Sequence, residues 1–255
     1  MKYRNDIEFY SLNGELMPIE GFPVEIVRSS GLVYEVVKYD RGKYLYFKEH
    51  LQRLQNSLEI IGKQSIDISK TEENAIKLAI SNNLHLGNLK IVVDFKNNVQ
   101  SIYLFFIPHR YPTSKQYKEG VMLKLQYAER HEPNAKVSNW KVRSSANKLI
   151  DNNEIYETLL VNTNNEITEG SRSNVFFVKD DVFYTAPNDK VLQGITRQKV
   201  IELINAKGFN LIYKCINVDQ LSDFDYCFIS GTSPGVLPIC RIENIDFDIN
   251  IYFTT

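Results

Sequence analysis

The feature that most constrains the fold of this chain is a break in its apolar pattern over Pro108–Gly120 (PHRYPTSKQYKEG). On both sides of the break, short apolar runs alternate with stretches of helical periodicity, whereas the break itself is rich in proline and charged residues. Such a composition is typical of a connection between compact parts. The sequence therefore predicts a small N-terminal α/β lobe over residues 1–112, a linker over 113–120 and a larger, strand-rich lobe over 121–255.

Hairpins and two helices are predicted in the N-terminal lobe. Asn13-Gly14, the strongest hairpin signal, lies between the strand-like runs Ile7–Tyr10 and Glu15–Pro18. Leucine and isoleucine at helical spacing predict an amphipathic helix over 50–62, and a similar pattern predicts another over 71–81.

Strands dominate the C-terminal lobe, and helices are few. The expected elements are a strand at 121–127, a helix around 144–152, strands within 155–185, a helix over 197–207, and strands near 211–216, 226–230 and 236–239. Many antiparallel hairpins with few helices indicate an α+β fold in two lobes.

Composition excludes several classes of protein. The chain has 255 residues, 43% of them hydrophobic and 24% charged, as expected of a folded globular protein. Thirty basic and 31 acidic residues give a net charge of −1, which provides no electrostatic footprint for nucleic acid. No run approaches the roughly 18 apolar residues of a membrane helix, and Met1–Asp6 is too polar for a signal peptide. We expect a cytoplasmic protein.

Cysteine and histidine give no metal or disulfide signal. The three cysteines are widely spaced and odd in number, which argues against a disulfide framework and favours buried thiols. None of the four histidines are paired at metal-ligand spacing, so no metal is expected.

Two segments could bind an anion. Gly194-Ile195-Thr196-Arg197 leads directly into the helix predicted at 197–207, and the unpaired amides of a helix N-terminus suit phosphate. Ser230–Gly235 (SGTSPG) follows a strand and offers hydroxyl groups and amides to an anion. Two simpler interpretations remain open: Thr196 caps its own helix, and the second segment is an ordinary turn.

Three further residues gain meaning only together. Arg53 lies off the apolar stripe of its helix, where it is either a solvated residue or a cation for phosphate oxygens. Lys136 and Glu169 taken singly would be ordinary surface residues. A pyridoxal phosphate enzyme, however, needs a lysine for a Schiff base, an acid for the ring nitrogen and a phosphate site.

Several segments, taken in order, resemble the class IV (fold type IV) pyridoxal-phosphate enzymes. This group includes branched-chain aminotransferases, D-amino acid aminotransferases and aminodeoxychorismate lyases. The resemblance spans about residues 24–240. It is carried by VYEVVK at 33–38, HLQRL at 50–54 with Ser57, NAKVSNW at 134–140, ITEGSRSNVF at 167–176, GITR at 194–197 and SGT at 230–232.

The resemblance implies a role for each matching residue. Lys136 would hold pyridoxal 5'-phosphate as a Schiff base and later move the α-proton, with Lys141 as the reserve choice. Glu169 would pair with the pyridine nitrogen, and Tyr34 would line the substrate pocket. The phosphate would be bound by Arg53, by the amides of Ile195 and Thr196, and by the Gly231-Thr232 region. The resemblance also implies a homodimer.

The chain departs from the family pattern where substrate is recognised. Trp140 occupies a place where some members carry tyrosine, and the strand over residues 91–99 contains neither the arginine nor the histidine that D-amino acid aminotransferases use for the substrate carboxylate. Arg28, Lys38 and Arg110 are the candidate carboxylate partners instead.

Three functions follow from these observations. The first is an aminotransferase that moves an amino group between an α-amino acid and a 2-keto acid. The second is a 4-amino-4-deoxychorismate lyase, which would eliminate pyruvate from an amino-chorismate substrate with the same lysine and cofactor. The third is a pyridoxal-phosphate-binding protein without efficient catalysis.

Overall fold

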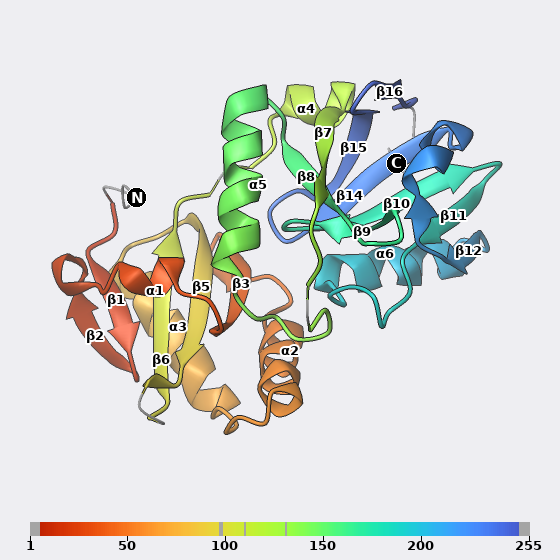
Figure 1. Cartoon of the computed structure of the whole chain (residues 1–255). Coiled ribbons are helices and arrows are strands. Elements are labelled where there is room, and N and C mark those ends of the chain that lie inside the picture. Colours follow the sequence, from red (N-terminus) through yellow and green to blue (C-terminus); the bar gives the residue numbers. More distant parts are fainter. Residues whose placement is uncertain (1–5, 97–98, 110, 131, 250–255) are drawn as a thin grey trace. The chain divides into compact units, whose positions relative to one another are not determined.

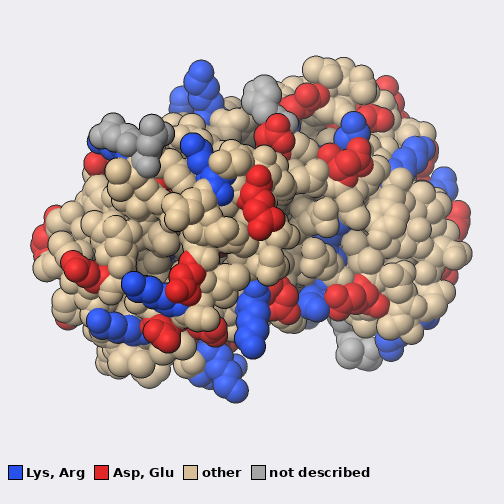
Figure 2. Space-filling view, turned by 90° about the horizontal axis from the view of Figure 1, so that it is seen from below, with Lys and Arg blue, Asp and Glu red and all other residues tan. Residues whose placement is uncertain are grey.

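The chain forms two compact units in a computed structural model. The first unit contains residues 1–110 and 135–140, and the second contains residues 111–134 and 141–255. The residues that the structure describes are 6–96, 99–109, 111–130 and 132–249. On the face of the molecule in Figure 2, basic and acidic side chains are interspersed.

The first unit is built on an antiparallel sheet of strand order β2-β1-β6-β5-β3-β4 (Figure 1). At the hairpin predicted from Asn13-Gly14, both residues adopt positive φ, 53° and 93°, as a tight two-residue turn requires. The strands are β1 (Phe9–Leu12), β2 (Glu15–Pro18), β3 (Val33–Asp40), β4 (Lys43–Tyr44), β5 (Leu86–Asp94) and β6 (Ser101–Ile107).

Two amphipathic helices contribute to the main core of this unit. Leu51, Leu54 and Leu58 of α2 (Phe47–Ile60) are fully buried with side chains of β3 and of α3 (Ile68–Ser81). A second, smaller core includes Phe22, Val92 and Phe105, together with Ile26 of the short helix α1 (Glu25–Arg28). Residues of β3 alternate between buried and half-buried, so the strand contributes to both cores.

The second unit contains a mixed sheet of order β12-β11-β10-β14-β15-β7-β8-β9-β13, with β16 paired to β15. Parallel pairing joins β7 to β8 and to β15, and joins β11 to β12. The strands are β7 (Val121–Tyr127), β8 (Glu157–Val161), β9 (Glu166–Gly170), β10 (Asn174–Lys179), β11 (Val182–Thr185), β12 (Asn210–Tyr213), β13 (Ile216–Asn217), β14 (Tyr226–Gly231), β15 (Gly235–Ile242) and β16 (Ile245–Asp246).

Helices of the second unit include α4 (Ser114–Glu119), α5 (Trp140–Asn153) and α6 (Ile195–Ala206). Thr113 and Gln116 form a capping box that starts α4, so the segment expected to be a linker over 113–120 contains a helix of the second unit instead. The return of residues 135–140 to the first unit is a second difference from the expected lobe boundaries.

The α+β fold class with a smaller antiparallel N-terminal lobe and a larger strand-rich lobe is confirmed. Cys215 and Cys227 are buried free thiols, as expected, whereas Cys240 is half-buried. Burial raises the pKa of the Cys215 thiol to about 11. Among the described helices, none has the length and apolar character needed to cross a membrane.

Candidate functional site

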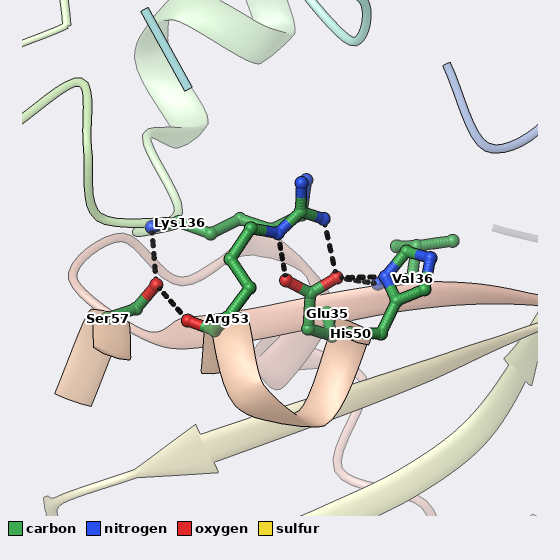
Figure 3. A network of polar contacts seen from close by, with 6 residues as sticks. All are labelled: Glu35, Val36, His50, Arg53, Ser57 and Lys136. Atoms are coloured by element: carbon green, nitrogen blue, oxygen red, sulfur yellow. Dashed lines mark hydrogen bonds and ion pairs between the residues drawn. The ribbon is translucent and has the colours of Figure 1, made fainter. Parts of the chain in front are cut away.

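The backbone of Lys136 is fixed by hydrogen bonds within the first unit (Figure 3). Its amide donates to the Ser57 hydroxyl at 3.1 Å, and its carbonyl accepts the Tyr34 amide at 3.0 Å. Ser57, fully buried on α2, donates in turn to the carbonyl of Arg53 at 2.8 Å. A pinned backbone limits the positions that the lysine amine can reach.

The side chain of Lys136 lies near an aromatic ring. Its Nζ is 5.1 Å from the centre of the Tyr34 ring, and Nζ of Lys90 lies 4.9 Å from the same centre. Lys90 was not among the predicted site residues. It is one of 30 basic residues, and only the pairing register of β3 and β5 shows that it lies near Tyr34.

Arg53 is not a solvated residue of the α2 surface. Its side chain is 11% exposed, and Nε and Nη2 donate to the two oxygens of Glu35 at 2.7 and 2.8 Å. Nδ1 of His50 lies 2.8 Å from Glu35 Oε2, and the Val36 amide donates to the same oxygen at 3.3 Å. The Arg53 guanidinium is thus held in a fixed orientation by a carboxylate.

Glu35 is completely buried, and its ionisation depends on these partners. Burial alone would raise its pKa, but the charge of Arg53 and the hydrogen bond with His50 outweigh burial and hold the pKa well below its usual range. The carboxylate is therefore ionised at neutral pH and offsets the positive charge of Arg53.

In the second unit, Glu169 is a buried carboxylate at the end of β9. Arg130 Nε lies 2.8 Å from its Oε1, and the amide of Leu192 and Nδ2 of Asn174 donate to its Oε2 at 3.2 and 3.4 Å. Arg130 was not predicted as a site residue. Glu169 is only 2% exposed, and these donors fix the orientation of its carboxylate.

Gly194 is the N-cap residue of α6 and provides no side-chain cap, and Thr196 is the second residue of the helix. The interpretation of Thr196 as the cap of its own helix is therefore wrong. A Cβ atom on Gly194 would lie 2.2 Å from Asn174 Oδ1, so a side chain here would force the Asn174 amide, which donates to the carbonyl of Leu192, to move. Arg197 in the same turn is buried and donates to Asn188 Oδ1 and to a backbone carbonyl, both at 2.8 Å, which anchors the start of α6.

The segment Ser230–Gly235 forms the turn of the β14–β15 hairpin. Gly231 and Thr232 are half-buried, and a Cβ on Gly231 would meet only ordinary contacts from 3.4 Å. The Tyr117 hydroxyl of α4 donates to the carbonyl of Pro234 at 2.7 Å and so tethers the turn.

Each unit contains some of the site residues predicted from the sequence. The first unit brings Lys136, Arg53 and Tyr34 together around α2 and β3. The second contains Glu169, the Ile195 and Thr196 amides, and the Gly231-Thr232 turn. Of the other candidates, Lys38 is on β3, Arg28 is in α1, and Arg110 lies outside the described residues.

The second unit offers a fitting environment for a phosphate group. Ser230 is paired with Asn174 across the sheet, and Asn174 in turn lies beside Gly194. Within the described part of the chain, the buried Ser230 hydroxyl has no hydrogen-bond partner. The unpaired hydroxyl of Ser230 and the uncapped N-terminus of α6 are donors of the kind that a phosphate requires.

The comparisons with known proteins agree with this chemistry. The profile of the amino-transferase class IV family matches residues 32–242. A probable branched-chain-amino-acid aminotransferase of Rickettsia conorii is 27% identical over 252 residues, covering 92% of this chain and 86% of that protein. A D-alanine aminotransferase of Listeria monocytogenes is 29% identical over 235 residues, covering 84% of this chain and 78% of that protein.

Solved structures share the fold. The T.th. branched-chain amino acid aminotransferase, crystallised with pyridoxamine 5'-phosphate, has a TM-score of 0.83 and 22% identity, covering 96% of this chain and 88% of that one. A putative 4-amino-4-deoxychorismate lyase from Legionella pneumophila has a TM-score of 0.79 and 20% identity, covering 88% and 87%.

The chain has the fold of these aminotransferase structures. Because the family profile extends over most of the chain, the chain belongs to the amino-transferase class IV family, whose cofactor is pyridoxal 5'-phosphate. The resemblance inferred from the sequence is therefore confirmed, whereas the roles of individual residues stay predictions.

Proposed function

We propose that this protein transfers an amino group between an α-amino acid and a 2-keto acid, with Lys136 as the residue that attaches the cofactor. The observation that supports this most directly is the fixed backbone of Lys136, whose amide donates to Ser57 and whose carbonyl accepts the Tyr34 amide. The names of the sequence relatives, branched-chain and D-alanine aminotransferases, support an amino acid substrate.

When bound, pyridoxal phosphate supplies an aldehyde that condenses with amines and a ring that withdraws electrons from the substrate α-carbon. The chain supplies the groups around it. Lys136 would hold the cofactor through its amine, and its Nζ would accept the α-proton of the substrate. Glu169 would hold the ring nitrogen and favour its protonated form, because the two charges are opposite.

Binding of the phosphate is assigned to Arg53, the amides of Ile195 and Thr196, and the Gly231-Thr232 turn. A guanidinium held by Glu35 loses little freedom on binding, and free amides at a helix N-terminus favour an anion. Tyr34 would contact the substrate. A homodimer, which the family resemblance implies, and a cytoplasmic location, which the composition led us to expect, are part of this proposal.

The decisive experiment is a panel of single amino acids added to the cofactor-loaded protein. We expect bleaching of the near-visible absorption band and release of a 2-keto acid for at least one amino acid. Formation of pyruvate and aminobenzoate from aminodeoxychorismate, without transfer to any keto acid, would identify a lyase instead. A band that responds to no amine would indicate a cofactor-binding protein and contradict the proposal.

A further inference from the structure

We propose that Lys90 makes Lys136 a weaker base, so that more of the Lys136 amine is unprotonated and able to attack a carbonyl group near neutral pH. Only an unprotonated amine can form a covalent bond with an aldehyde, and a neighbouring cation is one way to obtain it. The purpose of this effect rests on the proposed function of Lys136, but the effect itself can be measured without cofactor.

The geometry that carries the inference is the shared ring of Tyr34. Its centre lies 4.9 Å from Nζ of Lys90 and 5.1 Å from Nζ of Lys136, which limits the separation of the two nitrogens to about 10 Å. The face of an aromatic ring carries partial negative charge and attracts each ammonium group. Tyr34 therefore holds two like charges close together.

Backbone pairing fixes all three residues. In the antiparallel register of β3 and β5, Tyr34 lies opposite Val92, so Lys90 is its diagonal neighbour on the same face of the sheet. The Tyr34 amide donates to the carbonyl of Lys136 at 3.0 Å. The two amines are thus presented by hydrogen-bonded segments whose spacing is set by the sheet.

Other charged and titratable groups lie on the elements around Tyr34. Lys38 of β3 is on the same face and adds to the positive charge, whereas Asp94 of β5 opposes it. Burial and then the charge of Asp94 raise the pKa of Tyr103 on β6. Near α2, the charge of Arg53 is offset by Glu35, to which His50 is also bonded.

The size of the effect follows from the distance. Two unit charges about 10 Å apart in an effective dielectric of about 20 change the titration of an amine by about one pH unit. Because about 10 Å is the upper limit of the separation, this is a lower bound before screening by salt.

The test is the reactivity of Lys136 toward trace acetic anhydride as a function of pH, followed by peptide mass after hydroxylamine has removed any bound carbonyl compound. We expect Lys90→Met to move the midpoint upward by about one pH unit and to slow acetylation at pH 7 about tenfold. Lys90→Arg keeps the charge and should match the wild type. Lys38→Met, on the same face, is the control and should shift the midpoint less.

Two results would overturn the inference: an unchanged midpoint in Lys90→Met, or the same shift in Lys90→Arg as in Lys90→Met, which would indicate packing and not charge. A parallel titration of the absorption band of the cofactor-loaded protein separates this inference from the proposed function. If the acetylation midpoint shifts but no cofactor binds at Lys136, the proposed function fails and the inference stands. If cofactor binds at Lys136 but the acetylation midpoint does not shift, the inference fails and the proposed function stands.

Discussion

Replacing Glu35 by glutamine should destabilise the first unit strongly. The substitution keeps the size of the side chain but removes the charge that faces Arg53 and His50 in a fully buried position. The amide oxygen of glutamine can replace only one of the two carboxylate oxygens that accept from Arg53. The glutamine NH2 group then faces the other N–H donor of the guanidinium. Breaking one partner of a buried ion pair costs about 3–5 kcal/mol. We expect about 3 kcal/mol, because Arg53 is 11% exposed and partly screened.

The loss of unfolding free energy in Glu35→Gln should become smaller as the pH falls. The pKa of Glu35 is lower in the folded protein than in the unfolded chain, so its contribution is complete above the unfolded pKa of about 4.3 and is lost as the pH falls below it. Each pH unit in this range is worth about 1.4 kcal/mol. The difference between wild type and Glu35→Gln should therefore be constant from pH 8 to pH 5 and shrink by about 2 kcal/mol at pH 3.

Urea unfolding at each pH, followed by far-ultraviolet circular dichroism, measures the difference in free energy of unfolding. Hydrogen exchange of peptides from α2 and β3 assigns the loss to the first unit. Glu73→Gln, an exposed position of α3, is the matched control and should change stability by less than about 0.5 kcal/mol. A loss below about 1 kcal/mol in Glu35→Gln, or a difference that grows as the pH falls, would refute the reasoning.

Three further changes test the site. Lys136→Ala should fold normally but carry no covalent cofactor after borohydride reduction, whereas Lys141→Ala should retain the adduct; an adduct mapped to Lys141 in the wild type would show that the lysine assignment is wrong. Glu169→Ala should keep cofactor but lose at least about 100-fold in turnover, and near-normal turnover would exclude its role at the ring nitrogen. Gly194→Ala should weaken binding of pyridoxal phosphate at least about tenfold, because a Cβ would displace the neighbouring Asn174 side chain, whereas Gly21→Ala, with open space around it, should not. Equal affinities in spectroscopic titrations of the two glycine variants would contradict the assigned phosphate site.

Local sequence patterns predict several elements well. The strand expected at 121–127 has the same bounds in the structure, Val121–Tyr127, and the Asn13-Gly14 hairpin is predictable because its turn chemistry is local. The helix expected over 50–62 begins earlier, at Phe47, and ends at Ile60. Its N-terminal cap residue, Tyr46, adopts φ of 52° and has no side-chain cap, so no capping signal in the sequence marks the start.

Partners distant in sequence could not be predicted. The lysine and the glutamate of the site are identified through motif resemblance, but the residues that hold them depend on tertiary pairing. Glu35 enters the sequence argument only as part of a motif, and no local pattern links it to Arg53, its buried partner 18 positions away. Arg130 and Glu169 are 39 positions apart, and no periodicity in the sequence connects them. Lys90 likewise becomes relevant only through the register of two strands.

One turn of α2 links the two predicted cofactor contacts of the first unit. Arg53 and Ser57 are four positions apart, so they lie on the same face of the helix, and the Ser57 hydroxyl bonds back to the Arg53 carbonyl. The same hydroxyl accepts the Lys136 amide, which ties the lysine to the turn that presents the guanidinium. In the proposed function, the attachment of a cofactor aldehyde and the binding of its phosphate would therefore be coupled mechanically through one buried serine. A change in α2 that leaves both Arg53 and Lys136 intact should still weaken cofactor binding, because their spacing must match a rigid ligand.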